Sequence, residues 1–150
     1  MSVPPPLSIR VPGTVAGIGE AAAAFDAFRA AAAIADEGAW PVQVVLDEVL
    51  ANIVHHAYAG RGDGRIDLTF SVSPTAITVV VADDGPEMNP LALPEPDTTA
   101  PLEDRRVGGL GIHLVRRLMD RAEYSRRDGR NCLVLVRRFG AGAPTDPSKA

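Results

Sequence analysis

Several common functional motifs are missing from this 150-residue sequence, and each absence excludes a class of protein. A single cysteine, Cys132, rules out an internal disulfide and any CxxC metal or redox motif. The sequence has no GxxxxGK[ST] motif of P-loop enzymes, no HExxH motif and no GxSxG motif of serine hydrolases. The adjacent His55 and His56 cannot both point at one metal from a helix. No apolar run approaches the length of about 18 residues that a membrane-spanning helix needs.

The charge balance is close to neutral and excludes a strongly basic protein. Fifteen basic and 19 acidic residues give a net charge of −4. Such a chain has no general attraction to nucleic acid or to acidic membranes, and its paired arginines are scattered as on solvated faces. We therefore expect neither nucleic acid nor a membrane as a partner. Because no charged and then apolar leader opens the sequence, we expect a cytoplasmic protein.

The chain length suits one domain with a sizeable core. We predict this domain at residues 7–139, preceded by a flexible, proline-rich segment at residues 1–6. Residues 140–150, rich in Gly, Pro, Ser and Ala, are predicted to form a disordered tail.

Apolar periodicity predicts alternating groups of strands and helices. In chain order these are a strand at Leu7–Val11, a helix at Thr14–Glu37 ended by Gly38, a helix at Pro41–Ala59, strands at Arg65–Ser73 and Ala76–Ala82, a helix after Gly108, and two strands around the turn Asp128-Gly129. The strands arrive mostly as hairpins, and the second of them is the most continuously apolar, so we place it near the sheet centre. The predicted fold class is α+β, a two-layer sandwich with three helices on one face of a mostly antiparallel sheet.

The helix predicted at Pro41–Ala59 is the segment around which the chain is organised. It opens on a proline, as a first helical turn allows, and its apolar residues recur at helical spacing. Glu48 and Asn52 lie one turn apart on the same side of it. Polar groups on such a helix are costly unless something pairs with them. A surface glutamate and a surface asparagine are the alternative interpretation of this pair.

Two further motifs follow this helix. Asp83-x-Gly85 ends a strand, where a carboxylate can accept from an exocyclic amine and a glycine leaves room for a flat ring. A segment of about twenty residues without periodicity then leads to Gly108-Gly109-Leu110-Gly111, and such a segment is typically a lid or disordered. Glycines at a helix start let a polyanion approach the backbone N–H groups. Each motif is weak alone, but their order is more specific.

With these motifs, the chain resembles the GHKL (Bergerat-fold) ATPase superfamily. More narrowly, it resembles the small bacterial anti-sigma-factor serine kinases of partner-switching systems. The resemblance covers residues 7–139 and rests on LDEVLANIVHHAY, VVVADDGPEMNP and GGLGIHLVRRLMD. One departure is Glu87, which stands where the superfamily pattern DxGxG has its second glycine.

The resemblance implies a complete nucleotide site. ATP would bind between the lid and the helices, with Asn52 as the ligand to Mg²⁺ and Glu48 as the catalytic carboxylate. Asp83 would accept a hydrogen bond from the adenine amino group, and Gly85 would lie beneath the base.

The resemblance also assigns the phosphate end of the site. The backbone of Gly108, Gly109, Leu110 and Gly111 would hold the phosphates, and Arg105 would reach them from the lid unless it is a solvated lid charge. His56 would line the nucleotide pocket, the alternative being a partly buried histidine with a structural role only.

Two functions follow from this resemblance. The first is an enzyme that phosphorylates a serine on a STAS-domain anti-sigma-factor antagonist. The second is a nucleotide-gated binding module that sequesters a sigma factor or an equivalent target with little turnover. The family's habit implies a homodimer. A histidine-kinase catalytic domain is disfavoured, because no dimerisation helix with a phospho-accepting histidine precedes the domain.

Overall fold

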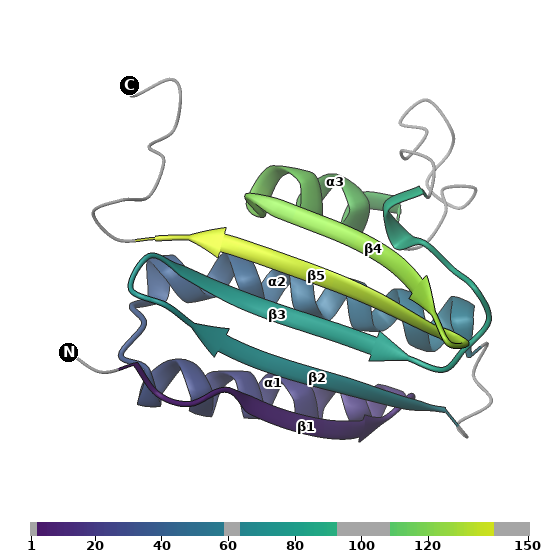
Figure 1. Ribbon diagram of the computed structural model, residues 1–150, viewed down its shortest axis with the longest axis horizontal. Coiled ribbons are helices and arrows are strands. Elements are labelled where there is room, and N and C mark those ends of the chain that lie inside the picture. Colours follow the sequence, from purple (N-terminus) through teal and green to yellow (C-terminus); the bar gives the residue numbers. More distant parts are fainter. Residues whose placement is uncertain (1–2, 59–63, 93–108, 140–150) are drawn as a thin grey trace.

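A computed structural model describes residues 3–58, 64–92 and 109–139, with the side chains of residues 109–112 left out (Figure 1). The elements in chain order are β1 (Leu7–Pro12), α1 (Val15–Ala31), α2 (Asp36–Asn52), a π-helical turn (Ile53–Ala57), β2 (Arg65–Val72), β3 (Ala76–Asp83), a 3₁₀ turn (Pro90–Ala92), α3 (Gly109–Leu118), β4 (Arg121–Arg127) and β5 (Arg130–Arg138). The predicted tail at residues 140–150 lies outside the described residues.

The five strands form one antiparallel sheet in the order β1-β2-β3-β5-β4. The helices α1, α2 and α3 lie on one face of this sheet (Figure 1). The α+β two-layer architecture predicted from the sequence is therefore confirmed. The central position of β3 also agrees with its more continuous apolar character.

The core lies between the sheet and the helices. Alternate residues of β2 and β3 point into it, and Phe70 of β2 is fully buried. The ring of Phe25 from α1 meets the ring of Phe70 edge-on at 5.5 Å. Period-two alternation is what a half-covered sheet requires, and even the apolar β3 obeys it, since Ile77, Val79 and Val81 are buried while Val80 is not.

Two predicted helix boundaries are wrong. The helix predicted to run to Glu37 ends at Ala31, and Ala33 adopts a positive φ of 56° in the connection. The next helix begins at Asp36 rather than at Pro41. Its first turn closes before the proline, because the N–H groups of Gly38 and Ala39 both donate to the carbonyl of Ala35 at 3.0 Å. The acidic residues of that turn also suit a helix N-terminus.

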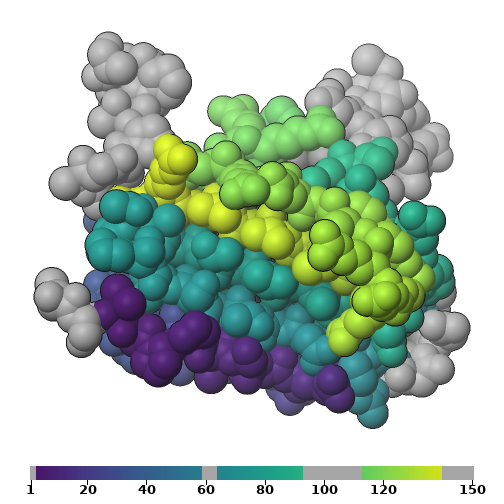
Figure 2. Space-filling model, viewed as in Figure 1, coloured from purple at the N-terminus to yellow at the C-terminus, as the bar shows by residue number. Residues whose placement is uncertain are grey.

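The β4–β5 hairpin turns at the predicted dipeptide. Asp128 and Gly129 have φ values of 52° and 75°, as a two-residue turn of the I′ type requires. Figure 2 shows the face of the sheet opposite the helices. There the side chains of the strands, from β1 at one edge to β4 at the other, form a broad surface that no described helix covers.

Candidate nucleotide-binding site

The end of α2 carries the two polar residues that the sequence singled out. Asn52, its last residue, is only 3% exposed, and its carboxamide has no hydrogen-bond partner among the described residues. Glu48 lies one turn earlier, is half-buried, and forms no ion pair within the described residues. A carboxamide without a protein partner is available to coordinate or hydrogen-bond a bound ligand.

The helix changes its winding directly after Asn52. Residues Ile53–Ala57 form a π-helical turn, in which the N–H of Tyr58 donates to the carbonyl of Ile53 at 3.0 Å. The wider turn rotates the next side chains away from the line that Glu48 and Asn52 define. His56 lies in this turn and is exposed. The alternative of a partly buried structural histidine is therefore wrong, and a role at the nucleotide pocket stays a prediction.

Asp83 lies at the end of β3 and is 3% exposed. Its Oδ1 atom accepts two hydrogen bonds, one from the backbone N–H of Gly85 and one from Nδ2 of Asn131, both at 2.9 Å. The first bond closes a tight turn around the Asp-x-Gly sequence. The second comes from β5, the neighbouring strand, where Asn131 stands in register with Asp83.

Close packing around this turn disfavours a side chain at Gly85. A Cβ atom there would lie 3.0 Å from Asp83 Oδ1 and 3.2 Å from both the Ala57 side chain and the Tyr58 ring. These contacts are tighter than ordinary van der Waals spacing. They explain the glycine by the protein's own side chains, and its placement beneath a base stays a prediction.

A shallow recess beside Asp83 opens to solvent and itself encloses room for about one water molecule. Its walls are mostly apolar, and Asp83, Tyr124 and Asn131 are its polar members. The lining residues from α2 and the π-helical turn are Val49 and Ile53, which directly follow Glu48 and Asn52 in the sequence.

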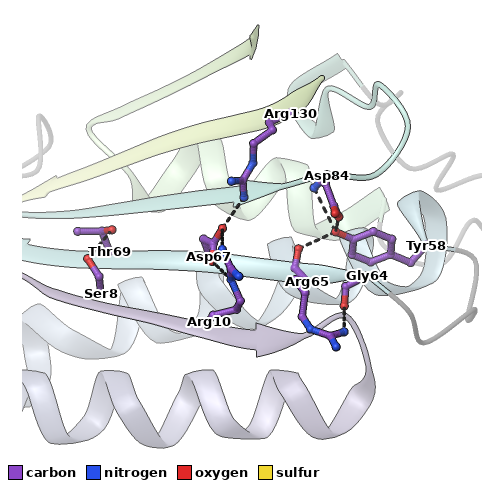
Figure 3. Close-up of polar contacts among 9 residues, drawn as sticks. All are labelled: Ser8, Arg10, Tyr58, Gly64, Arg65, Asp67, Thr69, Asp84 and Arg130. Carbon is purple, nitrogen blue, oxygen red and sulfur yellow. Dashed lines mark hydrogen bonds and ion pairs between the residues drawn. The ribbon is translucent and has the colours of Figure 1, made fainter. Parts of the chain in front are cut away.

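Tyr58 fastens the other side of the Asp-x-Gly turn (Figure 3). Its ring is 1% exposed. Its hydroxyl lies 2.7 Å from the Arg65 carbonyl and 2.6 Å from Asp84 Oδ1, and accepts from the Asp84 backbone N–H at 3.2 Å. Burial raises the pKa of Tyr58 well above its ordinary value, and the hydrogen bond from Tyr58 lowers the pKa of Asp84. The carboxylate beside Asp83 is thereby held in place.

The phosphate end of the predicted site is described only in part. Gly109, Leu110 and Gly111 form the start of α3, so the predicted helix start is confirmed. Arg105 and Gly108 lie outside the described residues, as does most of the predicted lid. The phosphate roles of these five residues therefore stay predictions.

Within the described residues there is no group of three His, Cys, Asp or Glu side chains suited to a metal ion. A magnesium ion that bridges phosphates keeps several waters and takes few protein ligands, so the Asn52 oxygen suits it. In the described part of the chain, no helix has both the length and the apolar character of a membrane span.

Sequence reasoning missed Asn131, Tyr124, Tyr58 and Asp84. The available signal for Asn131 was a carboxamide at the start of the otherwise apolar run Cys132–Val136. Asp84 is the middle residue of the Asp-x-Gly motif, but its partner Tyr58 is remote in the sequence, as Asn131 and Tyr124 are, so spacing alone could not link these side chains to the motif.

Comparison with known proteins finds protein kinases that are similar in sequence to this chain. The chain is 36% identical over 90 residues to the serine/threonine-protein kinase BtrW of Bordetella bronchiseptica, covering 60% of this chain and 63% of that protein. It is 33% identical over 94 residues to the serine-protein kinase RsbW of Bacillus pumilus, covering 59% of this chain and 58% of that protein. The matched region thus spans less than two thirds of either relative.

A solved structure supports the fold. The crystal structure of the RsbU and RsbW domains of Rv1364c from Mycobacterium tuberculosis matches with a TM-score of 0.66 at 18% identity. The match covers 95% of this chain and 35% of that chain. The model of the histidine kinase-like ATPase domain family matches residues 11–137. These residues include α1, α2, the Asp-x-Gly turn and α3, which begins at Gly109. The chain belongs to the histidine kinase-like ATPase domain family.

Proposed function

We propose that this chain binds ATP with Mg²⁺ and phosphorylates a serine of a STAS-domain anti-sigma-factor antagonist. In the same partner-switching system it would hold a sigma factor or an equivalent target. The observation that carries the proposal is the pairing of Glu48 and Asn52, both without described partners, beside a recess that contains Asp83. The names of the two kinase relatives support the choice of protein serine as the acceptor.

Each residue of the site would have a separate role in phosphoryl transfer. Asp83 would accept a hydrogen bond from the adenine amino group through its Oδ2 atom, since Oδ1 already accepts two bonds. Asn52 would hold Mg²⁺, and the ion, when bound, would supply positive charge that neutralises the phosphates. The backbone of Gly108, Gly109 and Gly111 would hold the phosphates, helped by Arg105.

Glu48 would act as the general base. It would take the proton of the serine hydroxyl as the serine oxygen bonds to the γ-phosphorus. The bond from that phosphorus to the bridging oxygen breaks at the same time, and ADP leaves. Most of the rate in such a reaction comes from positioning and electrostatics, so a base contributes a factor of about 10²–10⁴.

The test is transfer of labelled phosphate from ATP to the antagonist protein, in the presence of Mg²⁺. Glu48→Gln should lower the transfer rate by about 10²–10⁴-fold while ATP still binds. Asp47→Asn is the matched control, because it makes the same chemical change one residue earlier on the exposed side of α2, and it should transfer normally. Asn52→Ala should weaken binding of Mg²⁺–ATP in calorimetry.

The opposite results would be equally informative. Normal transfer by Glu48→Gln would remove this residue from the mechanism. Tight ATP binding with no transfer by the wild type would replace the kinase with a nucleotide-gated binding module. Failure to bind ATP at all would refute the proposal.

A further inference from the structure

Asn131 occupies a buried position where three segments meet. The residue lies at the start of β5 and is 4% exposed. Its Nδ2 atom donates to Asp83 Oδ1 at 2.9 Å and to the Pro86 carbonyl at 2.8 Å. Its Oδ1 atom accepts from the Met88 backbone N–H at 3.1 Å and from the Tyr124 hydroxyl at 2.6 Å. All four hydrogen-bonding positions of the carboxamide are therefore in use.

The orientation of this carboxamide is fixed by its backbone neighbours. The N–H of Met88 can only donate, and the carbonyl of Pro86 can only accept. A reversed carboxamide would place its NH₂ group against one donor and its oxygen against one acceptor. The NH₂ group must therefore face Pro86 and, with it, Asp83.

This arrangement decides which oxygen of Asp83 remains for a ligand. Oδ1 already accepts from Gly85 and Asn131, so Oδ2 is the atom left to accept from a molecule in the recess. A carboxylate oxygen accepts hydrogen bonds and donates none. A base with an amino group at that point is favoured, and one with a carbonyl oxygen there is rejected because two acceptors would meet.

The same residue also holds the backbone that follows Asp83. Its bonds to Pro86 and Met88 fix the chain on both sides of Glu87. Arg126 from the neighbouring strand β4 adds a bond from its guanidinium to the Gly85 carbonyl at 2.8 Å. The β4–β5 hairpin therefore holds the whole turn from Asp83 to Met88.

We propose that Asn131 is a positioning residue that sets the nucleobase selectivity of this site by aiming the Asp83 carboxylate. The inference rests on the proposed nucleotide binding, but assigns the choice between amino and carbonyl bases to the pair Asp83–Asn131. ATP and inosine triphosphate are the probes, because inosine carries a carbonyl in place of the adenine amino group, and a proton on the adjacent ring nitrogen.

The experiment measures the dissociation constants of ATP and inosine triphosphate by calorimetry for the wild type and for Asn131→Asp. The substitution keeps the side-chain shape but replaces the donor that faces Asp83 with an acceptor. The preference for ATP should fall at least about tenfold, the size expected for a lost charge-assisted hydrogen bond. Asn89→Asp is the matched control. Within the described part of the chain the Asn89 carboxamide uses its oxygen alone, as acceptor for the Leu91 N–H, so this variant should keep the wild-type preference.

A double substitution separates positioning from simple loss of structure. If Asn131 acts through Asp83, then Asn131→Asp should not change the preference further in an Asp83→Asn background. Asn131→Ala, which adds no charge, replaces Asn131→Asp if that variant fails to fold by circular dichroism, and the same loss of preference is expected.

Three results would overturn the inference. A folded Asn131 variant with the wild-type ratio would refute it while leaving ATP binding and kinase activity intact. Equal binding of the two nucleotides by the wild type would refute the selectivity alone. A wild type that binds neither nucleotide would refute the proposed function and this inference together.

Discussion

Replacing Tyr58 by phenylalanine tests whether the turn beside Asp83 is held by one buried hydroxyl. The substitution keeps the ring, which fills a space so tight that a Cβ on Gly13 or Gly64 would overlap it. It removes only the hydroxyl bonded to the Arg65 carbonyl and to Asp84. Any change in stability therefore reports on hydrogen bonds rather than on packing.

The size of the effect follows from which partners water can reach. A hydrogen bond contributes about 0.5–1.5 kcal/mol net, and a buried group left without a partner costs about 1–3 kcal/mol. Asp84 is exposed, so water can replace the hydrogen bond that its carboxylate loses. The hydrogen bond to the Arg65 carbonyl comes from a buried residue, so its loss is not replaced as easily. We expect a loss of about 1–2 kcal/mol in the free energy of unfolding, measured by urea titration with an unchanged m-value. The midpoint of thermal unfolding should fall by about 2–4 °C per kcal/mol.

The pH dependence gives the sharper test. The pKa of Asp84 is lowered in the folded protein by Tyr58, so its contribution is present above the unfolded pKa of about 4 and is lost as the pH falls. The pKa of Tyr58 is raised by burial, so its contribution is present below about pH 10 and is lost above it. The stability difference between wild type and Tyr58→Phe should thus be flat from about pH 5 to pH 9 and shrink on both sides.

Tyr124→Phe is the matched control, since it removes the hydroxyl of the other tyrosine. That hydroxyl donates to the neutral Asn131, so the control should show no change in its stability difference near pH 4. The reasoning about Tyr58 is wrong if its difference stays constant from pH 3 to pH 7, or if the control shows the same acid dependence.

Two further predictions concern the fold. Asp67 accepts from Arg10 at 2.7 Å and also pairs with Arg130, and the Arg10 hydrogen bond, with a further contribution from Arg130, lowers its pKa (Figure 3). Asp67→Asn should therefore lower the free energy of unfolding above about pH 4 but not below about pH 2. The loss should be only about 0.5–1 kcal/mol, because the ion pairs are partly exposed. Urea titrations at both pH values would measure it. Gly19→Ala in α1 should raise the free energy of unfolding by about 0.5–1 kcal/mol, since nothing lies within 4 Å of the added Cβ, whereas Gly17→Ala should lower it because that Cβ would overlap the Pro12 carbonyl. Equal thermal shifts for the two glycine variants would contradict this assignment.

The sheet was predictable because its signals are local. Strict alternation marked β2, and the Asp128-Gly129 dipeptide marked the hairpin. The connection between α1 and α2 could not be predicted, because alanine favours a helix at every position and Ala31–Ala35 carries no local stop signal. The break there comes from the need to turn the chain, and Ala33 adopts a positive φ to do so. Gly38, which looked like the stop, lies inside α2.

The candidate site was predictable where one element holds its residues. Helical spacing put Glu48 and Asn52 on one side of α2, and the Asp-x-Gly sequence marked a turn at a strand end. Asn131 lies 48 positions from Asp83 in the sequence, and only the strand register brings them together. The change from α to π winding after Asn52, within which the exposed His56 lies, has no local signal in the sequence.

That change of winding connects the two halves of the site. It follows Asn52 directly and brings Tyr58 to the position where its hydroxyl meets Asp84, the residue after Asp83. The end of α2 and the end of β3 are thus joined by a bond that involves neither Asn52 nor Asp83. A regular α-helix would turn Tyr58 away from Asp84, and the proposed magnesium ligand and the proposed base acceptor would lose their common support. We therefore regard the π-helical turn as part of the site's architecture, since π-turns within helices are frequent at functional positions.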